Sequence, residues 1–422
     1  MEQKQSISSK RTGRVKKHLA RIAILIIGVS AIISTPYIYF YAKYLRPDKI
    51  IPEFNSASVD QVIATDASTA SSLTDILLHS QKQYGLPSIS AAVGYADNKR
   101  WAAAIGYADI EHNEHAKVTS RYRLGSTSKA LTGVLLLRML DEKLINLDEP
   151  LSRYEKTIPS QYQQVTARQL ASHTAGVRHY SIPNWWLSDW ENYSNKQYRS
   201  VADGISLISD DKLLFSPGTD FKYSTFGYSL LAHGMEGAGK SGFSALLKEK
   251  LVTPAGMADT AVDDLTSMRN RVSFYNADSG KYIVAIPINS SYKIAGGGIV
   301  STPTDLVTLG LELLNKRFVT ENAKRVMWTP VFLENGKVNE ENYGLGWRID
   351  ESKRILGENN TVHIVHHGGV QPGGACFYML IPTSGLVVAV TTNSGTNIAR
   401  SAVQDIAYEL ARHLITSKQV PK

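Results

Sequence analysis

Ser126 and Lys129 stand three residues apart at the start of an apolar stretch, Ala130–Leu140, that is typical of a buried helix. This spacing places the serine hydroxyl and the lysine amine on the same helix face. A serine hydroxyl becomes a nucleophile when a neighbour accepts its proton, and a lysine accepts it when burial lowers the lysine pKa. Free N–H groups at the helix start also stabilise an oxyanion. The pattern therefore predicts a serine acyl-transfer site.

The S-x-x-K pattern alone is weak evidence, because it occurs again at Ser209–Lys212 and at Ser290–Lys293. Neither repetition is predicted to begin a buried helix, so Ser126 is the preferred nucleophile. The chain contains no G-x-S-x-G motif, which disfavours a Ser-His-Asp hydrolase on the α/β-hydrolase fold.

The segment Gly234–Ser241 matches the phosphate-binding pattern G-x-x-x-x-G-K-[ST]. Such a loop needs a strand before it and a helix after it, whereas the preceding residues, Tyr228–His233, have a helical pattern. We therefore expect a glycine-rich turn between two helices and no nucleotide partner.

The elements around these residues are predicted from hydrophobic periodicity. Helices are expected at 73–84, 130–140 and 402–414, and strands at 88–95, 100–107, 361–367, 375–381 and 386–392. The middle of the chain, to about Asn289, has a helical pattern with long loops. Strands at both ends with helices between them indicate an α/β core interrupted by a helical insertion.

The net charge of +8 is confined to the N-terminal region. Residues 1–49 contain ten Lys or Arg and two acids, and the remainder contains 36 bases and 36 acids. The neutral body gives no support to nucleic-acid binding. The single cysteine, Cys376, excludes a disulfide within the chain, a cysteine-based zinc site and an iron–sulfur cluster, and we expect an inert buried thiol.

Residues 22–42 form an uncharged stretch of 21 residues, preceded by seven bases and followed by a tyrosine-rich segment. As a helix it would span roughly 31 Å, which matches a bilayer core of about 30 Å. We predict a cytoplasmic basic tail at 1–21, a single transmembrane anchor at 22–42, a tether at 43–69 and a body outside the cytoplasm. A cleaved signal peptide is the alternative, but no A-x-A-like site follows the stretch.

Seven ordered segments of the body resemble the serine β-lactamase-like hydrolases, which include class C β-lactamases, penicillin-binding-protein-like carboxypeptidases and esterases. The resemblance covers about residues 70–415, and its motifs are most similar to those of a mitochondrial, peptidase-like branch of the family. The segments are Arg123–Gly133, Leu170–Gly176, Pro217–Tyr228, Gly256-Met257, Gly296–Asp305, Tyr343–Trp347 and His367–Gly369.

The resemblance implies an antiparallel sheet flanked by helices in an α/β (α+β) fold of the β-lactamase/transpeptidase type, spanning residues 70–418. Its sheet part would comprise 70–129 and 290–418, and its helical part 130–289. Ser126 would be acylated, while Lys129 and Tyr223 shuttle its proton, with Tyr223 held as a phenolate by the adjacent cation. The N–H groups of Ser126 and Val370 would form the oxyanion hole.

The strand bearing His367-Gly368-Gly369 would form the far wall of the site, with His367 facing the substrate and titrating near its ordinary pKa of about 6.5. Two positions depart from the family pattern: Thr225 replaces an asparagine and His367 replaces a lysine. A neutral imidazole holds a substrate carboxylate less firmly than an ammonium, so β-lactam hydrolysis is expected to be weak or absent.

These observations predict a membrane-anchored serine hydrolase for peptide, amide or ester substrates, without a cofactor. The alternative is a catalytically silent scaffold on the same fold. His366 and His367 point to opposite faces of a strand, so with His363 they do not predict a three-ligand metal site. A cluster of tryptophans at 185, 186 and 190 is compatible with a substrate-facing flap or with packing of an insertion.

Overall fold

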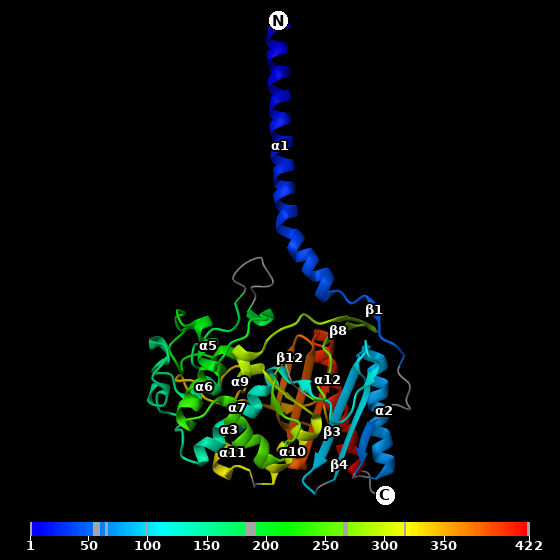
Figure 1. Cartoon of the computed structure of the whole chain (residues 1–422), viewed down its shortest axis with the longest axis vertical. Coiled ribbons are helices and arrows are strands. Elements are labelled where there is room, and N and C mark those ends of the chain that lie inside the picture. The colour runs from blue at the N-terminus through cyan, green and yellow to red at the C-terminus, as the bar shows by residue number, and fades with distance from the viewer. Residues whose placement is uncertain are drawn as a thin grey trace.

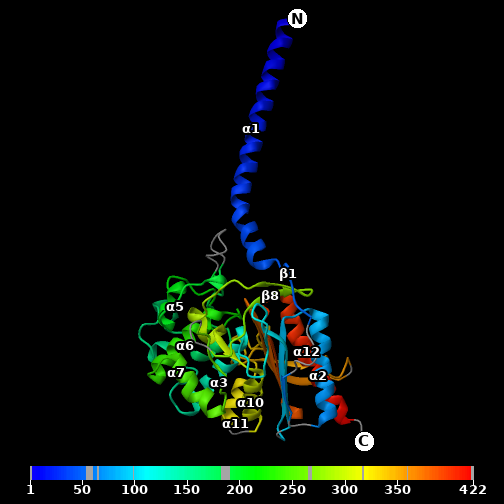
Figure 2. The ribbon, with the colours of Figure 1, turned by 45° about the vertical axis from the view of Figure 1, so that its right-hand side comes forward.

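A computed structural model describes residues 2–53, 60–63, 66–97, 99–181, 191–264, 269–315, 318–358 and 360–419. The body has two parts side by side, a helical part and a sheet with helices on its faces, and a long helix, α1, rises from it (Figures 1 and 2). The tryptophans at 185, 186 and 190, for which a substrate-facing flap and a packed insertion were the alternatives, lie outside the described residues.

The central sheet is antiparallel, as predicted, and contains the five predicted strands. Its order is β11-β12-β13-β14-β3-β4-β2, with β5 paired to β4. The strands are β2 (Asp60–Ile63), β3 (Ser88–Tyr95), β4 (Arg100–Asp109), β5 (Glu114–His115), β11 (Arg348–Ser352), β12 (Val362–Gln371), β13 (Gly374–Ile381) and β14 (Leu386–Thr392). The short edge strand β11 pairs with β12 only as far as Arg348 opposite His366, so the later residues of β12 are not paired with β11.

Both faces of the sheet are covered, and this explains why the central strands β13 and β14 are buried along their whole length and mostly apolar. Helices α2 (Ala67–Tyr84) and α12 (Asn397–Gln419) pack on one face, where Ile364 and Phe377 belong to their core. Helix α10 (Pro303–Leu314) packs on β3 and β14 on the other face, where Val365 joins the core of the helical part.

The helical part is built around α3 (Ser128–Asp141) and α6 (Thr225–Gly239), both almost entirely buried. The remaining helices are α4 (Ala167–Ala171), α5 (Val201–Ile205), α7 (Phe243–Leu247), α8 (Thr253–Ala255), α9 (Ile294–Gly297) and α11 (Glu321–Met327). The body also contains two small sheets with the strand orders β6-β10-β7 and β1-β9-β8. Their strands are β1 (Lys49–Ile50), β6 (Tyr122–Arg123), β7 (Ala261–Val262), β8 (Tyr275–Asp278), β9 (Lys281–Val284) and β10 (Ile299–Ser301).

The boundary between the parts is less simple than the sequence pattern suggested. Strands β7, β8 and β9 lie within the range predicted as helical, and α10 and α11 lie within a range predicted as sheet. The two parts therefore exchange elements along the chain. The sequence did not reveal this exchange, because strands as short as β7 carry too little periodicity to be recognised.

The phosphate-loop match lies within a helix and its cap. Its glycines belong to α6, and Lys240 is the left-handed C-cap that ends this helix. A Cβ at Gly234 would lie 2.3 Å from Leu151, so this glycine serves close packing. Because no strand precedes the segment, it lacks the geometry of a phosphate loop.

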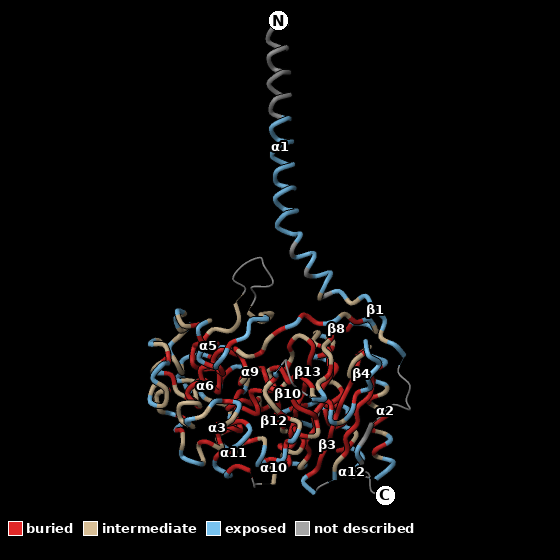
Figure 3. The backbone as a smooth tube through the Cα atoms, viewed as in Figure 1, coloured by how far each residue is buried: buried red, intermediate tan, exposed pale blue. Residues whose placement is uncertain are grey.

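The N-terminal region contains one helix long and apolar enough to cross a membrane, over Lys16–Tyr44. Helix α1 (Glu2–Phe40) is solvent-exposed where its burial is described (Figure 3), and a π-helical turn, Tyr41–Leu45, comes directly after it. The predicted tether is partly docked on the body. Asn276 Nδ2 donates a hydrogen bond to the Tyr44 carbonyl at 2.7 Å, β1 pairs with β9, and β2 pairs with β4.

Candidate active site

A tight turn presents Ser126 at the entry of the buried helix α3. A 3₁₀ turn, Gly125–Thr127, precedes α3, and Gly125 has φ of +53°, which favours glycine. Side chains on both sides of Ser126 fix the turn: Thr127 Oγ1 donates to the His367 carbonyl at 3.2 Å, and Ser128 Oγ accepts from Ile299 N at 3.2 Å. The Ser126 side chain remains partly exposed to a cavity.

Lys129 is fully buried one helical turn below Ser126. Its Nζ lies 3.3 Å from Ser126 Oγ, 3.2 Å from Thr225 Oγ1 and 2.6 Å from the Gly296 carbonyl oxygen. Burial lowers the pKa of Lys129 well below its ordinary value, and the charges of Lys293 and Arg348 lower it further. A neutral amine at this position can accept the serine proton.

Tyr223 lies next to this pair, with Lys129 Nζ 4.8 Å from its ring centre. Burial raises the pKa of Tyr223 to about 12, although a hydrogen bond with Ser126 opposes the shift. The predicted phenolate is therefore wrong for neutral pH. The desolvation of the ring outweighs the neighbouring cations, and Tyr223 is a neutral phenol that can donate a hydrogen bond.

Strand β12 approaches the Ser126 turn closely enough to bring two backbone N–H groups together. A Cβ on Gly369 would lie 2.0 Å from the Leu124 carbonyl and 2.7 Å from Ser126 N. A Cβ on Gly125 would lie 2.7 Å from Val370 N. Both glycines are thus required for this approach, which sets the N–H groups of Ser126 and Val370 at the same wall of the cavity.

Thr225 begins α6 and contacts Lys129 directly. Ser224 caps the helix by accepting a hydrogen bond from Gly227 N at 2.9 Å. Thr225 N donates to His179 Nδ1 at 3.2 Å, and burial lowers the pKa of His179 to about 3, so its imidazole is neutral. The threonine therefore uses its hydroxyl to position Lys129, in place of the amide that an asparagine would offer.

His367 does not line the cavity that Ser126 faces, which corrects the prediction that this side chain would face a substrate. It is fully buried, and its Nε2 lies 2.8 Å from Tyr343 Oη while its Nδ1 lies 2.6 Å from the Gly368 carbonyl oxygen. Burial lowers the pKa of His367 well below its ordinary value, and Arg348 and Lys129 add to the effect. The imidazole supports the wall behind Tyr223 and stays neutral near pH 7.

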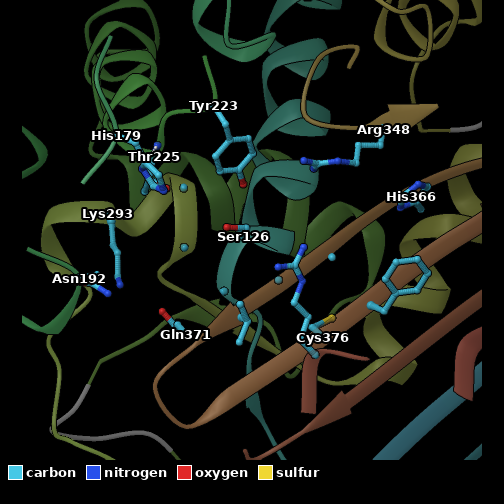
Figure 4. A pocket seen from close by; sticks show the side chains of 18 of the residues that line it. Ser126, His179, Asn192, Tyr223, Thr225, Lys293, Arg348, His366, Gln371 and Cys376 are labelled. Carbon is cyan, nitrogen blue, oxygen red and sulfur yellow. Dashed lines mark hydrogen bonds between the residues drawn. The ribbon is translucent and has the colours of Figure 1, made fainter. Parts of the chain in front are cut away.

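The cavity above Ser126 has a volume of about 620 Å³. Figure 4 shows Ser126 at its centre, Tyr223 and Arg348 on one side and Lys293 on the other. Arg348 is partly exposed and forms an ion pair with Glu341, which also lines the cavity. The cavity therefore carries cationic groups on both sides of the nucleophile.

Sequence reasoning missed Lys293, the last residue of another S-x-x-K. Ser290 and Lys293 are 1% and 2% exposed, and the short 3₁₀ turn Ser291–Lys293 leads into the short, mostly buried helix α9, which corrects the expectation that this repetition would not begin a buried helix. Burial lowers the pKa of Lys293 to about 7. Only tertiary packing reveals the position, because a turn this short has no periodic signal.

His173 is a second residue that pattern reasoning passed over, although it lies in the segment Leu170–Gly176 used for the resemblance. It has φ of +63°, its ring centre lies 4.2 Å from that of Tyr223, and its Nδ1 accepts a hydrogen bond from Ser224 N at 3.2 Å. Its role is to hold the Tyr223 segment in place. Cys376 is buried in β13, and burial raises its pKa to about 12, as expected for an inert thiol.

The chain is similar to serine β-lactamase-like proteins and penicillin-binding proteins. It is 27% identical over 390 residues to the mitochondrial serine β-lactamase-like protein LACTB of Homo sapiens, which covers 73% of this chain and 71% of that protein. It is 26% identical over 285 residues to penicillin-binding protein 4* of Bacillus subtilis, covering 64% of this chain and 60% of that protein.

Solved structures share the fold at lower identity. A penicillin-binding protein homologue from Pyrococcus abyssi superposes with a TM-score of 0.67 at 20% identity, covering 82% of this chain and 77% of that one. A D-amino acid amidase from Ochrobactrum anthropi superposes with a TM-score of 0.69 at 17% identity, covering 82% and 99%. The β-lactamase family model matches residues 72–413, and the chain therefore belongs to the β-lactamase family of serine-hydrolase-like proteins.

Proposed function

We propose that this chain is a membrane-anchored serine hydrolase that forms an acyl-enzyme on Ser126 and acts on peptide, amide or ester substrates outside the cytoplasm. The observation that carries the proposal is the 3.3 Å contact between Ser126 Oγ and the buried Lys129 Nζ at a cavity of about 620 Å³. A cavity of this size accommodates a small-molecule or short peptide substrate.

The reaction begins when neutral Lys129 accepts the hydroxyl proton of Ser126. The Oγ then attacks the substrate carbonyl carbon, and the carbonyl oxygen becomes an oxyanion that accepts hydrogen bonds from Ser126 N and Val370 N. The hydrogen-bond acceptors Gly296 O and Thr225 Oγ1 stabilise the Lys129 ammonium that forms in this step.

Collapse of the tetrahedral intermediate breaks the bond to the leaving nitrogen or oxygen, which takes a proton from Lys129 by way of the Tyr223 hydroxyl. Water then attacks the Ser126 ester and gives its proton to Lys129. The acid product leaves, and the proton returns to Ser126. Tyr223 stays a neutral donor throughout, in keeping with its raised pKa.

Hydrolysis of β-lactams is proposed to be weak or absent. Thr225 commits its hydroxyl to Lys129, and His367 is buried against Tyr343. Neither residue offers the substrate contact that an asparagine or a lysine would provide at these positions. A penicillin is therefore expected to acylate Ser126 slowly or not at all.

Intact-mass analysis of the purified chain with a fluorophosphonate and with a penicillin tests the acylation proposal. We expect one fluorophosphonate adduct per chain, mapped to Ser126 by peptide sequencing, and little penicillin adduct. The silent-scaffold alternative predicts no adduct with either probe and unchanged mass after prolonged incubation.

Membrane anchoring through residues 22–42 is the second component of the proposal. The apolar helix over Lys16–Tyr44 and the basic residues before it support an orientation with the N-terminus in the cytoplasm. The full chain should pellet with membranes, and protease added on the non-cytoplasmic side should release the body. A full-length chain recovered in the soluble cytoplasm, or a mature chain that lacks residues 1–42, would contradict this anchor.

A further inference from the structure

The end of the body nearest the anchor takes no part in the mechanism above. Strands β1 and β8 lie at the base of α1 in both ribbon views (Figures 1 and 2). With β9 between them they form a small antiparallel sheet, in which Ile50 lies opposite Lys281 and Asn276 lies opposite Ile283. Opposed residues of antiparallel strands share a face, as do residues two apart along one strand. These four side chains therefore lie on one face of the sheet, which we call the outer face.

The inner face of this small sheet is covered by the body. Tyr275 and Tyr282 lie on it and are buried in a cluster with Tyr107 of β4. On the outer face, by contrast, Ile50 is 76% exposed and Lys281 is also exposed. A single exposed isoleucine is ordinary in a soluble domain, so the meaning of this one depends on its surroundings.

The end of the anchor contacts this same outer face. Asn276 Nδ2 donates a hydrogen bond to the Tyr44 carbonyl oxygen at 2.7 Å. Tyr44 also packs against Ile286 and Ile288, which follow β9 along the chain. The last residues of the anchor are therefore held on the outer face of the sheet and on the segment next to it.

A second segment of the body lies beside the anchor. Tyr193, at the end of the 3₁₀ turn Glu191–Tyr193, packs against the same two isoleucines as Tyr44. Burial raises the pKa of Tyr193, and the nearby Tyr37 of α1 raises it further. Asn192 of this turn lines the catalytic cavity. The turn next to the anchor is thus also part of the cavity wall.

The tyrosines of the anchor indicate the depth at which this face would lie in a membrane. Tyr37, Tyr39 and Tyr41 are exposed, and Tyr44 comes directly after them. Aromatic side chains concentrate at the level of the lipid headgroups. Ile50 is six positions after Tyr44, so the two lie at most about 20 Å apart. An anchor that spans the bilayer therefore brings the outer face to the headgroup region.

We propose that the outer face of the β1-β9-β8 sheet is a membrane-docking surface that lies against the phospholipid headgroups of the bilayer crossed by residues 22–42. Ile50 inserts among the headgroups, and the Lys281 ammonium opposite it binds a lipid phosphate. The inference rests on the anchor of the proposed function and adds to it the side of the body that faces the membrane. The turn that carries Asn192 then holds the catalytic cavity beside the bilayer.

Fluorescence quenching tests this surface on the full chain in vesicles of phosphatidylcholine and phosphatidylglycerol. A cysteine is introduced by I50C or by K281C and labelled with a nitrobenzoxadiazole dye, whose emission reports the polarity around it. Cys376 is buried and should stay unlabelled, which the wild-type chain verifies. We expect both labels to emit at shorter wavelength than in water and to lose most of their intensity when the vesicles contain a lipid with a nitroxide headgroup.

V62C is the matched control. Val62 is 56% exposed in β2, which pairs with the start of β4, and there Arg100 donates a hydrogen bond to Thr308 of α10 at 3.1 Å. Helix α10 lies at the end of the body away from α1 (Figures 1 and 2). The V62C label should emit as it does in water and should not be quenched. The surface is overturned if the I50C and K281C labels are quenched no more strongly than this one.

A charge reversal tests the contact with phosphate. K281E should weaken the quenching of the I50C label, because it replaces an attraction to the lipid phosphate by a repulsion. K99E is the control, since Lys99 is exposed beside the start of β4. Equal quenching of the I50C label in the K281E and K99E backgrounds would remove Lys281 from the surface and contradict the proposed phosphate contact.

Two further outcomes identify a different occupant or a missing anchor. An I50C label that is shielded from water and unquenched by lipid, with shielding that grows with the protein-to-lipid ratio, shows a second copy of the chain on this face and overturns the membrane surface. Flotation separates this failure from that of the anchor. A chain that floats with the vesicles but has unquenched labels overturns the docking surface alone, whereas a chain that does not float overturns the anchor and the surface together.

Discussion

Two S-x-x-K segments meet at one cavity, and their geometries differ. At Ser126–Lys129 the hydroxyl and the amine lie 3.3 Å apart at the entry of a long buried helix. At Ser290–Lys293 the buried Ser290 hydroxyl has no hydrogen-bond partner among the described residues, and the Lys293 side chain lines the cavity. The same four-residue pattern thus forms a nucleophile–base pair in one place and separates into two independent side chains in the other.

The difference arises from the element that carries each motif. Helix α3 runs over Ser128–Asp141 and holds Lys129 one turn below the serine, whereas the turn Ser291–Lys293 is short and changes direction into α9. A helical spacing argument applies only where a helix exists at both positions. The motif is therefore informative about chemistry only together with its secondary structure.

The largest expected effect concerns the nucleophile itself. Ser126→Ala should lower kcat/KM by on the order of 10³-fold or more, because the alkoxide attack is lost while oxyanion contacts remain. It should also abolish fluorophosphonate labelling, whereas Ser290→Ala should retain it. Labelling that persists in the Ser126→Ala protein and maps to Ser290 would reverse the assignment of the two motifs.

The second prediction concerns the base. Because burial lowers the pKa of Lys129 well below its ordinary value, its neutral form is present at a lower pH than for a free lysine. For a neutral ester, kcat/KM should rise with pH through that lowered pKa and reach a plateau below pH 10. Lys129→Met should lower kcat by about 10²–10⁴-fold and remove the rise. A profile that increases only near pH 10.5 would show that Lys129 is not perturbed.

Much of this arrangement was accessible from the sequence. The bounds of β3 and β14 coincide with the predicted strands, because long apolar runs between turn residues leave little ambiguity. The ordered motif matches predicted that six residues share one site, and the structure places these six together. They are Ser126, Lys129, Tyr223, Thr225, Gly369 and Val370.

What the sequence could not reveal depends on burial. His367 was expected to titrate near its ordinary pKa of about 6.5. In the structure it is buried and contacts Tyr343, which lies 24 residues away along the chain, and burial lowers the pKa of His367. Tyr223 was expected as a phenolate, but desolvation raises its pKa to about 12. Such shifts arise from the depth of a side chain, which motif spacing does not encode.

The third prediction concerns how the second motif, through Lys293, makes the free energy of unfolding depend on pH. The pKa of Lys293 is lowered to about 7, so between pH 7 and about 10 the unfolded state binds more protons than the folded state. The free energy of unfolding should therefore rise with pH in this range, by up to about 1.4 kcal/mol per pH unit from this lysine.

Lys293→Met should flatten that rise and stabilise the protein near pH 7, where the wild type carries the cost of a buried charge. Denaturant unfolding at pH 7, 8 and 9 measures both effects. Lys240→Met is the control, because Lys240 is an exposed helix cap. An identical slope in the Lys293→Met and Lys240→Met proteins would contradict a perturbed Lys293.

The smallest effect is expected at Ser290. Its buried hydroxyl has no hydrogen-bond partner in the part of the chain that the structure describes, so Ser290→Ala removes a desolvated polar group and breaks no side-chain hydrogen bond found there. The free energy of unfolding should change by less than about 1 kcal/mol, with stabilisation the favoured direction. A loss of several kcal/mol would show instead that the Ser290 hydroxyl makes a stabilising hydrogen bond in the folded protein.

The docking of residues 41–50 has a consequence for how the body is held. The docking uses the hydrogen bond to the Tyr44 carbonyl, the packing of Tyr44 against Ile286 and Ile288, and the pairing of β1 with β9, whereas the exposed Lys49–Glu111 pair adds little. The continuous chain favours this small contact because it keeps the two sides at an effective concentration on the order of millimolar. A single cut at residues 51–59 would abolish that advantage, so we expect proteolysis there to weaken the docking of residues 41–50 on the body as well as to divide the chain.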